Sequence, residues 1–490
     1  MSLLRKFAGQ TVIYGFGYIS SKLANYLLAV ILLTYLLGEK TEGFGVYDYM
    51  YAYAGVFITL FSFRFDSALF RFGNKNENLD DALSNALLFV SVSASALVVL
   101  GVLFNTAISD FVGYPCQPKY VRWFAFILAF DVVNVIPFAK LRLENKAKKF
   151  ALLRILNVVL SSLLIVFFLV IYPRLGATFL PVQDSIVNWV FISNLIASGL
   201  LFLALLPELR GTKIKMDSLL FQKMIRYAYP LVIVGAAGIF VQAFSTPLQE
   251  YFLPGTDKEN MAQAGIYSST RRIAAFFLMF ITAFNYAAEP FFFNNSSKED
   301  REKYYGKICR LFTLIGGAVI LMMYYGVDLL KYILESNFWS SLPLLPILLM
   351  SYLLLGIYYN IAIWYKLADM TLYGALISIL GAFITLGISA AFLPTIGYAA
   401  SAWASLASYI FMVGLGYFIG QNKYPISYPM GKIILDLLLI ASLLIVGLLI
   451  RTHASIPLKY VSYLLILCLF FYYVYYSEKE EWRKIFRWTK

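Results

Sequence analysis

The stretch IVNWVFISNLIASGLLFLALL, residues 186–206, has no charged side chain and is long enough to cross a lipid bilayer as one α-helix. Apolar runs of about 20 residues, the length that a spanning helix needs, recur along the whole chain. Of the 490 residues, 61% are hydrophobic and 14% are charged, whereas an average soluble domain has about 25% charged residues. The sequence therefore predicts an all-α polytopic membrane protein, and it excludes a soluble multidomain enzyme, a disordered chain and a single-anchor protein.

The apolar runs predict about fourteen membrane-spanning helices. Most of the 40 lysines and arginines fall in the two terminal segments and in alternate connections between the spans. Because basic connections stay in the cytoplasm, both termini are expected to be cytoplasmic. The net charge of +13 is then explained by topology and attraction to the membrane surface, not by nucleic-acid binding. The spans are expected at 10–37, 43–63, 82–106, 120–138, 151–172, 186–206, 226–248, 265–293, 308–327, 340–365, 371–393, 397–420, 431–450 and 458–476.

A long basic connection at 207–225 follows the sixth span and divides the chain. It predicts two six-helix lobes, residues 1–210 and 211–422, followed by a pair of helices and a cytoplasmic tail at 423–490. Two similar halves are typical of a transporter that holds its substrate between them.

Lys22 lies near the middle of the first expected span, where a charge is costly unless it faces a wet cavity or a partner. At 100° per residue it shares a polar stripe with residues on the same helix face. We expect Lys22 to line a substrate cavity, although a structural lysine bonded to carbonyls of a neighbouring helix would show the same pattern. The other residues of the stripe are Gln10, Tyr14, Tyr18, Ser21 and Asn25.

Arg271 and Arg272 fall inside the eighth expected span, because the apolar core from Ile273 to Phe284 is too short to cross a membrane alone. A guanidinium group is suited to binding phosphate oxygens. We therefore expect at least one of the two to face a cavity, the alternative being a side chain that reaches lipid headgroups. Arg64, near the cytoplasmic end of the second span and on one face with Arg71, is a further candidate for substrate binding or headgroup anchoring.

Two acids in the expected spans are candidates for coupling to a proton or sodium gradient, namely Asp131 and Glu289. Asp131 has Asn134 on the same side of its helix, and an ion pair with a neighbouring cation would explain it equally well. Glu289 shares a face with Arg271 but is about 27 Å away along the helix, so the two cannot pair.

Tyr47, Tyr49, Tyr51 and Tyr53 alternate along the outer part of the second expected span. Sugars stack on aromatic rings, which would suit a glycan path. The alternative is the belt of aromatic side chains at a membrane–water interface.

No metal, cofactor or ATP site is expected. Cys116, Cys309 and Cys468 are far apart in the sequence, and His453 is the single histidine. The chain has no G-x-x-x-x-G-K-[ST] motif, so transport would depend on an ion gradient or on the membrane potential.

Several segments resemble bacterial polysaccharide repeat-unit (O-antigen, Wzx-type) flippases of the multidrug/oligosaccharidyl-lipid/polysaccharide exporter superfamily. The order and spacing of the segments carry this resemblance over most of residues 10–310. The segments are YGFGYISSKLANYLLAVILLTYLLGEKTEGFGVYDYMYAY (14–53), FSFRFDSALFRF (61–72), IPFAKLRLENKAKKFALLRILN (136–157), IRYAYPLVI (225–233) and AGIYSSTRRIA (264–274).

The resemblance implies a V-shaped, two-lobed exporter in the bacterial inner membrane that alternates between inward-open and outward-open states. It implies a substrate of undecaprenyl-pyrophosphate carrying a short glycan, no enzymatic activity, and polysaccharide polymerase machinery as a partner. It also implies a lateral groove for the lipid tail along the last two helices. In the related peptidoglycan-precursor flippase, cations on the first, second and eighth helices hold the pyrophosphate. Lys22, Arg64, Arg271 and Arg272 lie on matching helices, whereas the position of Arg64 is more often a small residue in the family.

Two alternative functions remain at this stage. A drug or cation antiporter of the same superfamily would usually have twelve spans and an acid in its first or a nearby helix, and residues 10–37 contain no acid. A flippase for the peptidoglycan precursor lipid II would have the same number of spans as expected here.

Overall fold

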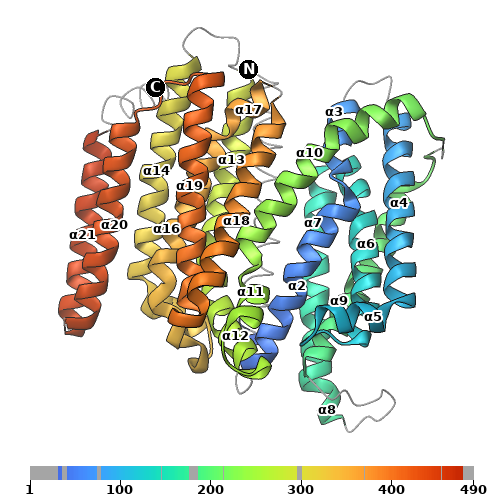
Figure 1. The fold of residues 1–490 in the computed structure, drawn as a ribbon, viewed down its shortest axis with the longest axis horizontal. Coiled ribbons are helices and arrows are strands. Elements are labelled where there is room, and N and C mark those ends of the chain that lie inside the picture. The colour runs from blue at the N-terminus through green and yellow to red at the C-terminus, as the bar shows by residue number, and fades with distance from the viewer. Residues whose placement is uncertain are drawn as a thin grey trace.

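The computed structural model describes residues 31, 33–35, 41–73, 79–144, 146–175, 186–212, 215–294, 301–368, 370–453 and 455–477. These residues are helical almost throughout and contain no β-strand (Figure 1). The predicted all-α membrane architecture is therefore confirmed.

The first half of the described chain contains nine helices of varied length. It comprises α2 (Thr41–Ser62), α3 (Phe65–Gly73), α4 (Leu79–Leu103), α5 (Asn105–Val112), α6 (Pro118–Leu143), α7 (Ala147–Val166), α8 (Tyr172–Arg174), α9 (Ile186–Leu205) and α10 (Ser218–Ala243). A π-helical turn at Phe167–Ile171 joins α7 to α8, and a 3-10 turn at Leu206–Leu209 follows α9.

The second half begins with two helices at one end of the molecule, α11 (Ser245–Phe252) and α12 (Asp257–Ala274). The remaining helices are α13 (Phe276–Asn294), α14 (Arg301–Tyr325), α15 (Val327–Leu330), α16 (Leu345–Ile361), α17 (Ile363–Leu367), α18 (Thr371–Ile396), α19 (Ala399–Lys423), α20 (Met430–His453) and α21 (Ile456–Ser477). Two 3-10 segments, Lys331–Ile333 and Ser336–Leu344, lead from α15 into α16.

Twelve helical segments of the described chain are long and apolar enough to span a membrane. They correspond to twelve of the fourteen expected spans. The span at 10–37 lies mostly outside the described residues. The span at 265–293 is not one continuous helix, because it is interrupted at Ala275 between α12 and α13. The total of fourteen therefore stays a prediction.

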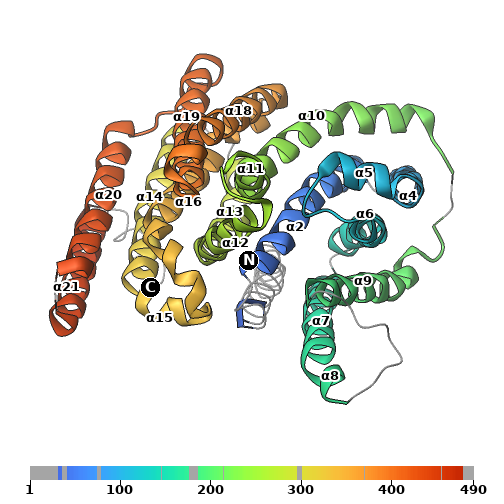
Figure 2. The same ribbon diagram turned by 60° about the horizontal axis from the view of Figure 1, so that its bottom comes forward.

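The helices form two bundles with two oblique helices between them (Figures 1 and 2). We call α4, α6, α7 and α9 the first bundle, and α13, α14, α16, α18 and α19 the second bundle. Between them, α2 contacts α6 on one side and α12 on the other, and α10 contacts α3 and α18. The boundaries expected for the lobes, 1–210, 211–422 and 423–490, stay predictions.

The contact between α2 and α12 is unusually close, because glycines replace side chains where the helices meet. A Cβ atom on Gly45 would lie 2.1 Å from the carbonyl oxygen of Met261, and one on Gly265 would lie 2.1 Å from that of Thr41. Small residues allow membrane helices to approach at the distance of backbone contact. This contact fixes α2 against the second half of the chain at the end of the molecule that carries α11 and α12 (Figure 1).

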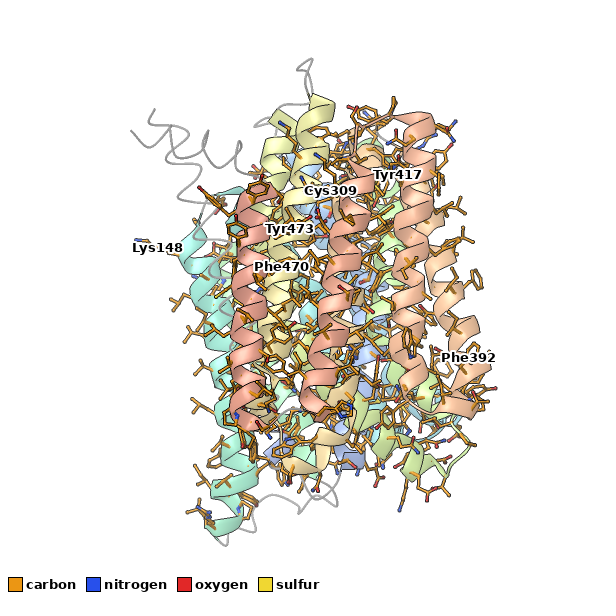
Figure 3. The ribbon with its side chains drawn as sticks, turned by 90° about the vertical axis from the view of Figure 1, so that its left-hand side faces the viewer. Lys148, Cys309, Phe392, Tyr417, Phe470 and Tyr473 are labelled. Atoms are coloured by element: carbon orange, nitrogen blue, oxygen red, sulfur yellow. The ribbon has the colours of Figure 1, made fainter. Side chains whose placement is uncertain are left out.

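Helices α20 and α21 pack outside the second bundle, against α14. Arg310 of α14 donates from Nε to Oδ2 of Asp436 on α20 at 3.0 Å, and the hydroxyl of Tyr473 on α21 donates to Oδ1 at 2.5 Å. Figure 3 views this side of the molecule and labels Tyr473 and Phe470 on α21. Because Asp436 is fully buried, these bonds fix the position of the last two helices along the bundle.

Candidate substrate site between the bundles

Asp48 of α2 joins the two halves of the chain by binding both arginines of α12. Its Oδ2 accepts from Nη2 of Arg271 at 2.6 Å, and its Oδ1 accepts from Nη2 of Arg272 at 2.9 Å. Thr246 of α11 donates a third bond to Oδ2 at 2.7 Å. We call these four residues the outer cluster, because the charge distribution of the sequence predicts that this end of the molecule faces outward. One carboxylate faces two guanidinium groups there, which leaves the cluster with an excess positive charge.

The two guanidinium groups have donor capacity left over. Nη1 of Arg271 donates to the backbone carbonyl of Gln242 at 3.0 Å, and the guanidinium of Arg272 lies over the rings of Phe44 and Tyr47. The Nε atoms of both arginines are buried and have no acceptor within the described part of the chain. Buried donors without acceptors are costly, and each one needs an explanation such as a bound water or ion.

Three residues of the outer cluster, Asp48, Arg271 and Arg272, line a cavity of about 350 Å³, which we call the outer cavity. Its wall combines helices of both bundles with α2, α10 and α12. Ligand pockets commonly have volumes of about 300–1,000 Å³, so the cavity can take a small anionic group. The residues around it are Tyr47, Asp48, Tyr51, Ala52, Asn194, Gln242, Ala243, Arg271, Arg272, Ala275, Leu278 and Tyr352.

A second cavity of about 390 Å³, the inner cavity, also includes Gln242 and extends toward the end of the molecule that carries α3 and α17. Arg64 enters it from the α2–α3 connection, and Lys366 enters it from α17. The described residues that line it include no Asp or Glu. They are Thr59, Arg64, Leu231, Val234, Gly235, Gly238, Ile239, Val241, Gln242, Asn285, Leu355, Tyr358, Tyr359, Ala362, Ile363, Tyr365, Lys366, Ser378, Tyr409 and Met412.

The position of Arg64 results from a break in the helix. Phe63 and Arg64 have φ angles of 50° and 53°, and among the described residues no other non-glycine residue has a positive φ. Such a conformation costs of order 1–3 kcal/mol for each residue. It ends α2, and the carbonyl of Arg64 then accepts from the amides of Ser67 and Ala68 to begin α3. The expectation that Arg64 and Arg71 share one helix face is therefore wrong, and Arg71 instead stacks on Tyr227.

The structure places three of the four expected cations in these two cavities. Arg271 and Arg272 both lie in the outer cavity, so neither side chain reaches for lipid headgroups, and Arg64 lies in the inner cavity. Lys22 lies outside the described residues. Their part in substrate binding stays a prediction.

Of the two expected coupling acids, Asp131 lines neither cavity, and the side chain of Glu289 lies outside the part of the chain that the structure describes. Asp131 of α6 accepts a bond from the hydroxyl of Ser198 on α9 at 3.2 Å. Glu289 falls within α13, but its side chain lies outside what the structure describes. Ion coupling through either residue stays a prediction.

Sequence reasoning missed Asp48 and Lys366. A charge inside a span is costly, and this argument applies to Asp48 as it does to Lys22. The tyrosines around Asp48 instead indicate a glycan path or an aromatic belt. The interpretation as an interfacial aromatic belt is wrong for Tyr47 and Tyr49, because both side chains are buried inside the protein. Lys366 lies in a connection between two expected spans, where the charge distribution predicts only the orientation of the chain.

The family model described as polysaccharide biosynthesis protein matches residues 11–296. Among curated proteins, none matches the sequence. The solved structure of the lipid II flippase MurJ in an inward closed conformation is 14% identical, covers 96% of this chain and 99% of its own, and has a TM-score of 0.69.

Two solved transporter structures show the same fold over a smaller share of the chain. An outward-facing multidrug resistance MATE family transporter of the MOP superfamily is 13% identical, covers 85% of this chain and 94% of its own, and has a TM-score of 0.57. A MATE protein in complex with MaD3S is 14% identical, covers 85% of this chain and 95% of its own, and has a TM-score of 0.60. The expected exporter fold is thus confirmed.

Proposed function

We propose, from the premise that this chain belongs to the polysaccharide biosynthesis protein family, that it is a flippase for lipid-linked oligosaccharides. Its substrate would be a polyprenyl pyrophosphate that carries a glycan repeat unit, such as an O-antigen unit. The protein would move the headgroup across the bacterial inner membrane by alternating access, as a transporter and not an enzyme. Both termini would be cytoplasmic, and polymerase machinery on the far side would take up the product.

The outer cluster is the observation that carries this proposal. A pyrophosphate cannot enter a low-dielectric interior unless cations and hydrogen-bond donors compensate its charge. Arg271 and Arg272 offer two guanidinium groups side by side, each with a buried Nε that has no acceptor in the described chain. Planar guanidinium groups bind phosphate oxygens through two parallel bonds.

Asp48 would act as an internal substitute for the phosphate. Its two carboxylate oxygens occupy the same two guanidinium groups that the substrate needs. An arriving pyrophosphate would compete with Asp48, free α2 from α12, and so favour opening at the outer end. Such competition also keeps binding moderate, which a transporter needs because the substrate must leave again.

Transport would draw on an ion gradient or on the membrane potential acting on the anionic substrate. Asp131 and Glu289 are the proposed coupling residues for a proton or sodium ion, and Lys22 a further cation for the pyrophosphate. The lipid tail would stay in the bilayer beside α20 and α21.

A lipid II flippase is the second candidate. The MurJ structure covers 96% of this chain, while the two MATE structures cover 85% of it. Lipid II also carries a pyrophosphate, so the outer cluster suits both substrates. Drug antiport is less well supported because the outer cavity has more cations than acids.

Complementation tests the proposal. A strain without its own O-antigen flippase would receive the wild-type protein or the Lys22→Gln, Arg271→Gln, Arg272→Gln triple variant at matched levels, with Lys423→Gln as the control. We expect surface glycan with the wild type and the control, and none with the triple variant. Full export by the triple variant would contradict the cationic site, and rescue of a MurJ-depleted strain alone would favour lipid II.

A further inference from the structure

A third cavity, of about 520 Å³, borders α2 on a different face from the outer cavity, and we call it the lateral cavity. The α2 residues that line it recur every three or four positions and so form one stripe along the helix. Asp48 and Tyr51, which line the outer cavity, lie on another face of α2. The α2 residues of the lateral cavity are Met50, Tyr53, Ala54, Phe57 and Phe61.

The wall of the lateral cavity is apolar and has an open side. The described residues that line it come from α2, α4, α5, α6 and the α5–α6 connection, and they include no charged side chain. Phe57 of α2 and Leu100 of α4 are 41% and 47% exposed, so the cavity is open at these two helices. An apolar cavity of about 150 Å³ stays dry and binds a hydrocarbon such as benzene. The lateral cavity is therefore suited to hydrocarbon and not to water.

The short helix α5 indicates the depth of the lateral cavity in the membrane. Helices α2, α4 and α6 belong to segments that are long and apolar enough to span a membrane, whereas α5 lies in the connection between α4 and α6 (Figure 2). Ile108, Phe111 and Val112 of α5 line the cavity, while Asp110 is exposed. An amphipathic helix of this kind is typical of the boundary between headgroups and acyl chains. The cavity below it then lies among the acyl chains of one leaflet, which the charge distribution predicts to be the outer one.

Aromatic contacts of α2 separate the lateral cavity from the outer cavity. Tyr51 lines the outer cavity, and its ring centre is 5.3 Å from that of Phe124, which lines the lateral cavity. Tyr53 packs on Phe244, which follows α10, with ring centres 4.9 Å apart. A lipid tail attached to a headgroup in the outer cavity would have to pass these contacts. The lipids that surround the spans reach the open side of the lateral cavity directly.

We propose that an acyl chain of a bilayer phospholipid occupies the lateral cavity and holds α2 against α4 and α6. The phospholipid is a structural ligand, distinct from any transported substrate. Because α2 also carries Asp48, a chain in this cavity supports the helix that closes the outer end.

Photo-crosslinking tests the occupancy of the cavity. The purified full-length protein is placed in vesicles with phosphatidylglycerol that carries a diazirine in one acyl chain, and adducts are located by mass spectrometry. Ala107→Phe adds a ring at an exposed position of α5 that lines the cavity. Ala96→Phe, at an exposed position of α4 outside the lining, is the matched control. We expect adducts at Leu100 and Phe111 in the wild type and the control, and loss of these adducts in Ala107→Phe.

Thermal unfolding tests whether the chain supports α2. A ligand that binds only the folded state raises the melting temperature. Phospholipid added to delipidated protein in detergent should raise the melting temperature of the wild type and of Ala96→Phe by the same amount. The rise should be smaller for Ala107→Phe, because the added ring takes the place of the chain.

The outcomes are distinct. Equal adducts in Ala107→Phe and Ala96→Phe would refute occupancy of the cavity by an acyl chain, and an equal rise in melting temperature would refute the support of α2. Stronger labelling of the cavity by a polyprenyl phosphate with the same diazirine would overturn the proposal in favour of a substrate-like tail. The flippase proposal stands in the first two cases, because it depends on the outer cluster and not on the lateral cavity.

Discussion

Asp48 of α2 and Arg271 of α12 lie 223 positions apart in the chain, and their side chains form an ion pair of 2.6 Å between Oδ2 and Nη2. The pair lies beside the glycine contact of Gly45 with α12, so packing and charge hold the same two helices together. Since residues of both α2 and α12 line the outer cavity, separation of these helices would widen it.

Asp48→Asn should weaken the closed outer end. Removing one partner of a buried ion pair typically costs about 3–5 kcal/mol, and here it leaves two neighbouring guanidinium groups without their carboxylate. We expect faster labelling of Tyr51→Cys in the outer cavity by a membrane-impermeant thiol reagent, together with a lower melting temperature. Asp110→Asn, a change at an exposed acid of α5, is the control. Equal labelling rates of Tyr51→Cys with Asp48 and with Asp48→Asn would show that the ion pair does not close the cavity.

Gly265→Ala should keep α2 and α12 apart. The added methyl group would meet the carbonyl oxygen of Thr41 at 2.1 Å, so the helices must separate. Overpacking of this kind typically costs about 1–3 kcal/mol, and we expect loss of export in the complementation assay. Gly387→Ala on α18 is the matched control, because a Cβ there meets no atom within 4 Å. Normal export by Gly265→Ala would mean that close contact of the two helices is dispensable.

Glu250, at the outer end beyond α10, should make stability depend on pH. Burial, together with the neighbouring charge of Asp257, raises the pKa of Glu250 to about 7. The folded protein then binds a proton that the unfolded chain releases near pH 4.3, so stability falls as the pH rises from about 4 to 7. The melting temperature should accordingly decrease over this window, and Glu250→Gln should remove part of that decrease. An identical slope in wild type and variant would contradict this assignment.

Orientation in the membrane can be tested at single cysteines. The charge distribution predicts that Lys146→Cys and Arg210→Cys face the cytoplasm, while Lys119→Cys and Lys258→Cys face the outside. Impermeant reagent added to intact cells should label the second pair alone, and lysis should make the first pair reactive. Labelling of Lys146→Cys in intact cells would show that the inner end of the molecule faces the outside. The proposed direction of transport would then be reversed.

Much of the fold follows from local composition. A run of about 20 apolar residues cannot satisfy its backbone polar groups in lipid except as a helix, and for this reason twelve of the expected spans appear in the structure. The resemblance to polysaccharide exporters also rests on local motifs, and the family match confirms it. Helix breaks were missed: neither Phe63–Arg64 nor Ala275 contains the glycine or proline that usually announces one.

By itself, the sequence determined that Arg271 and Arg272 directly precede an apolar run and need a partner if they lie in the membrane, because a charge in hydrocarbon is costly wherever the chain places it. Only the tertiary structure decided that the partner is Asp48, and that Arg64 faces a different cavity with Lys366. Helix periodicity relates residues within a few turns of one another. It carries no information on which helix packs beside which, and an ion pair between α2 and α12 exists only once the two bundles have come together.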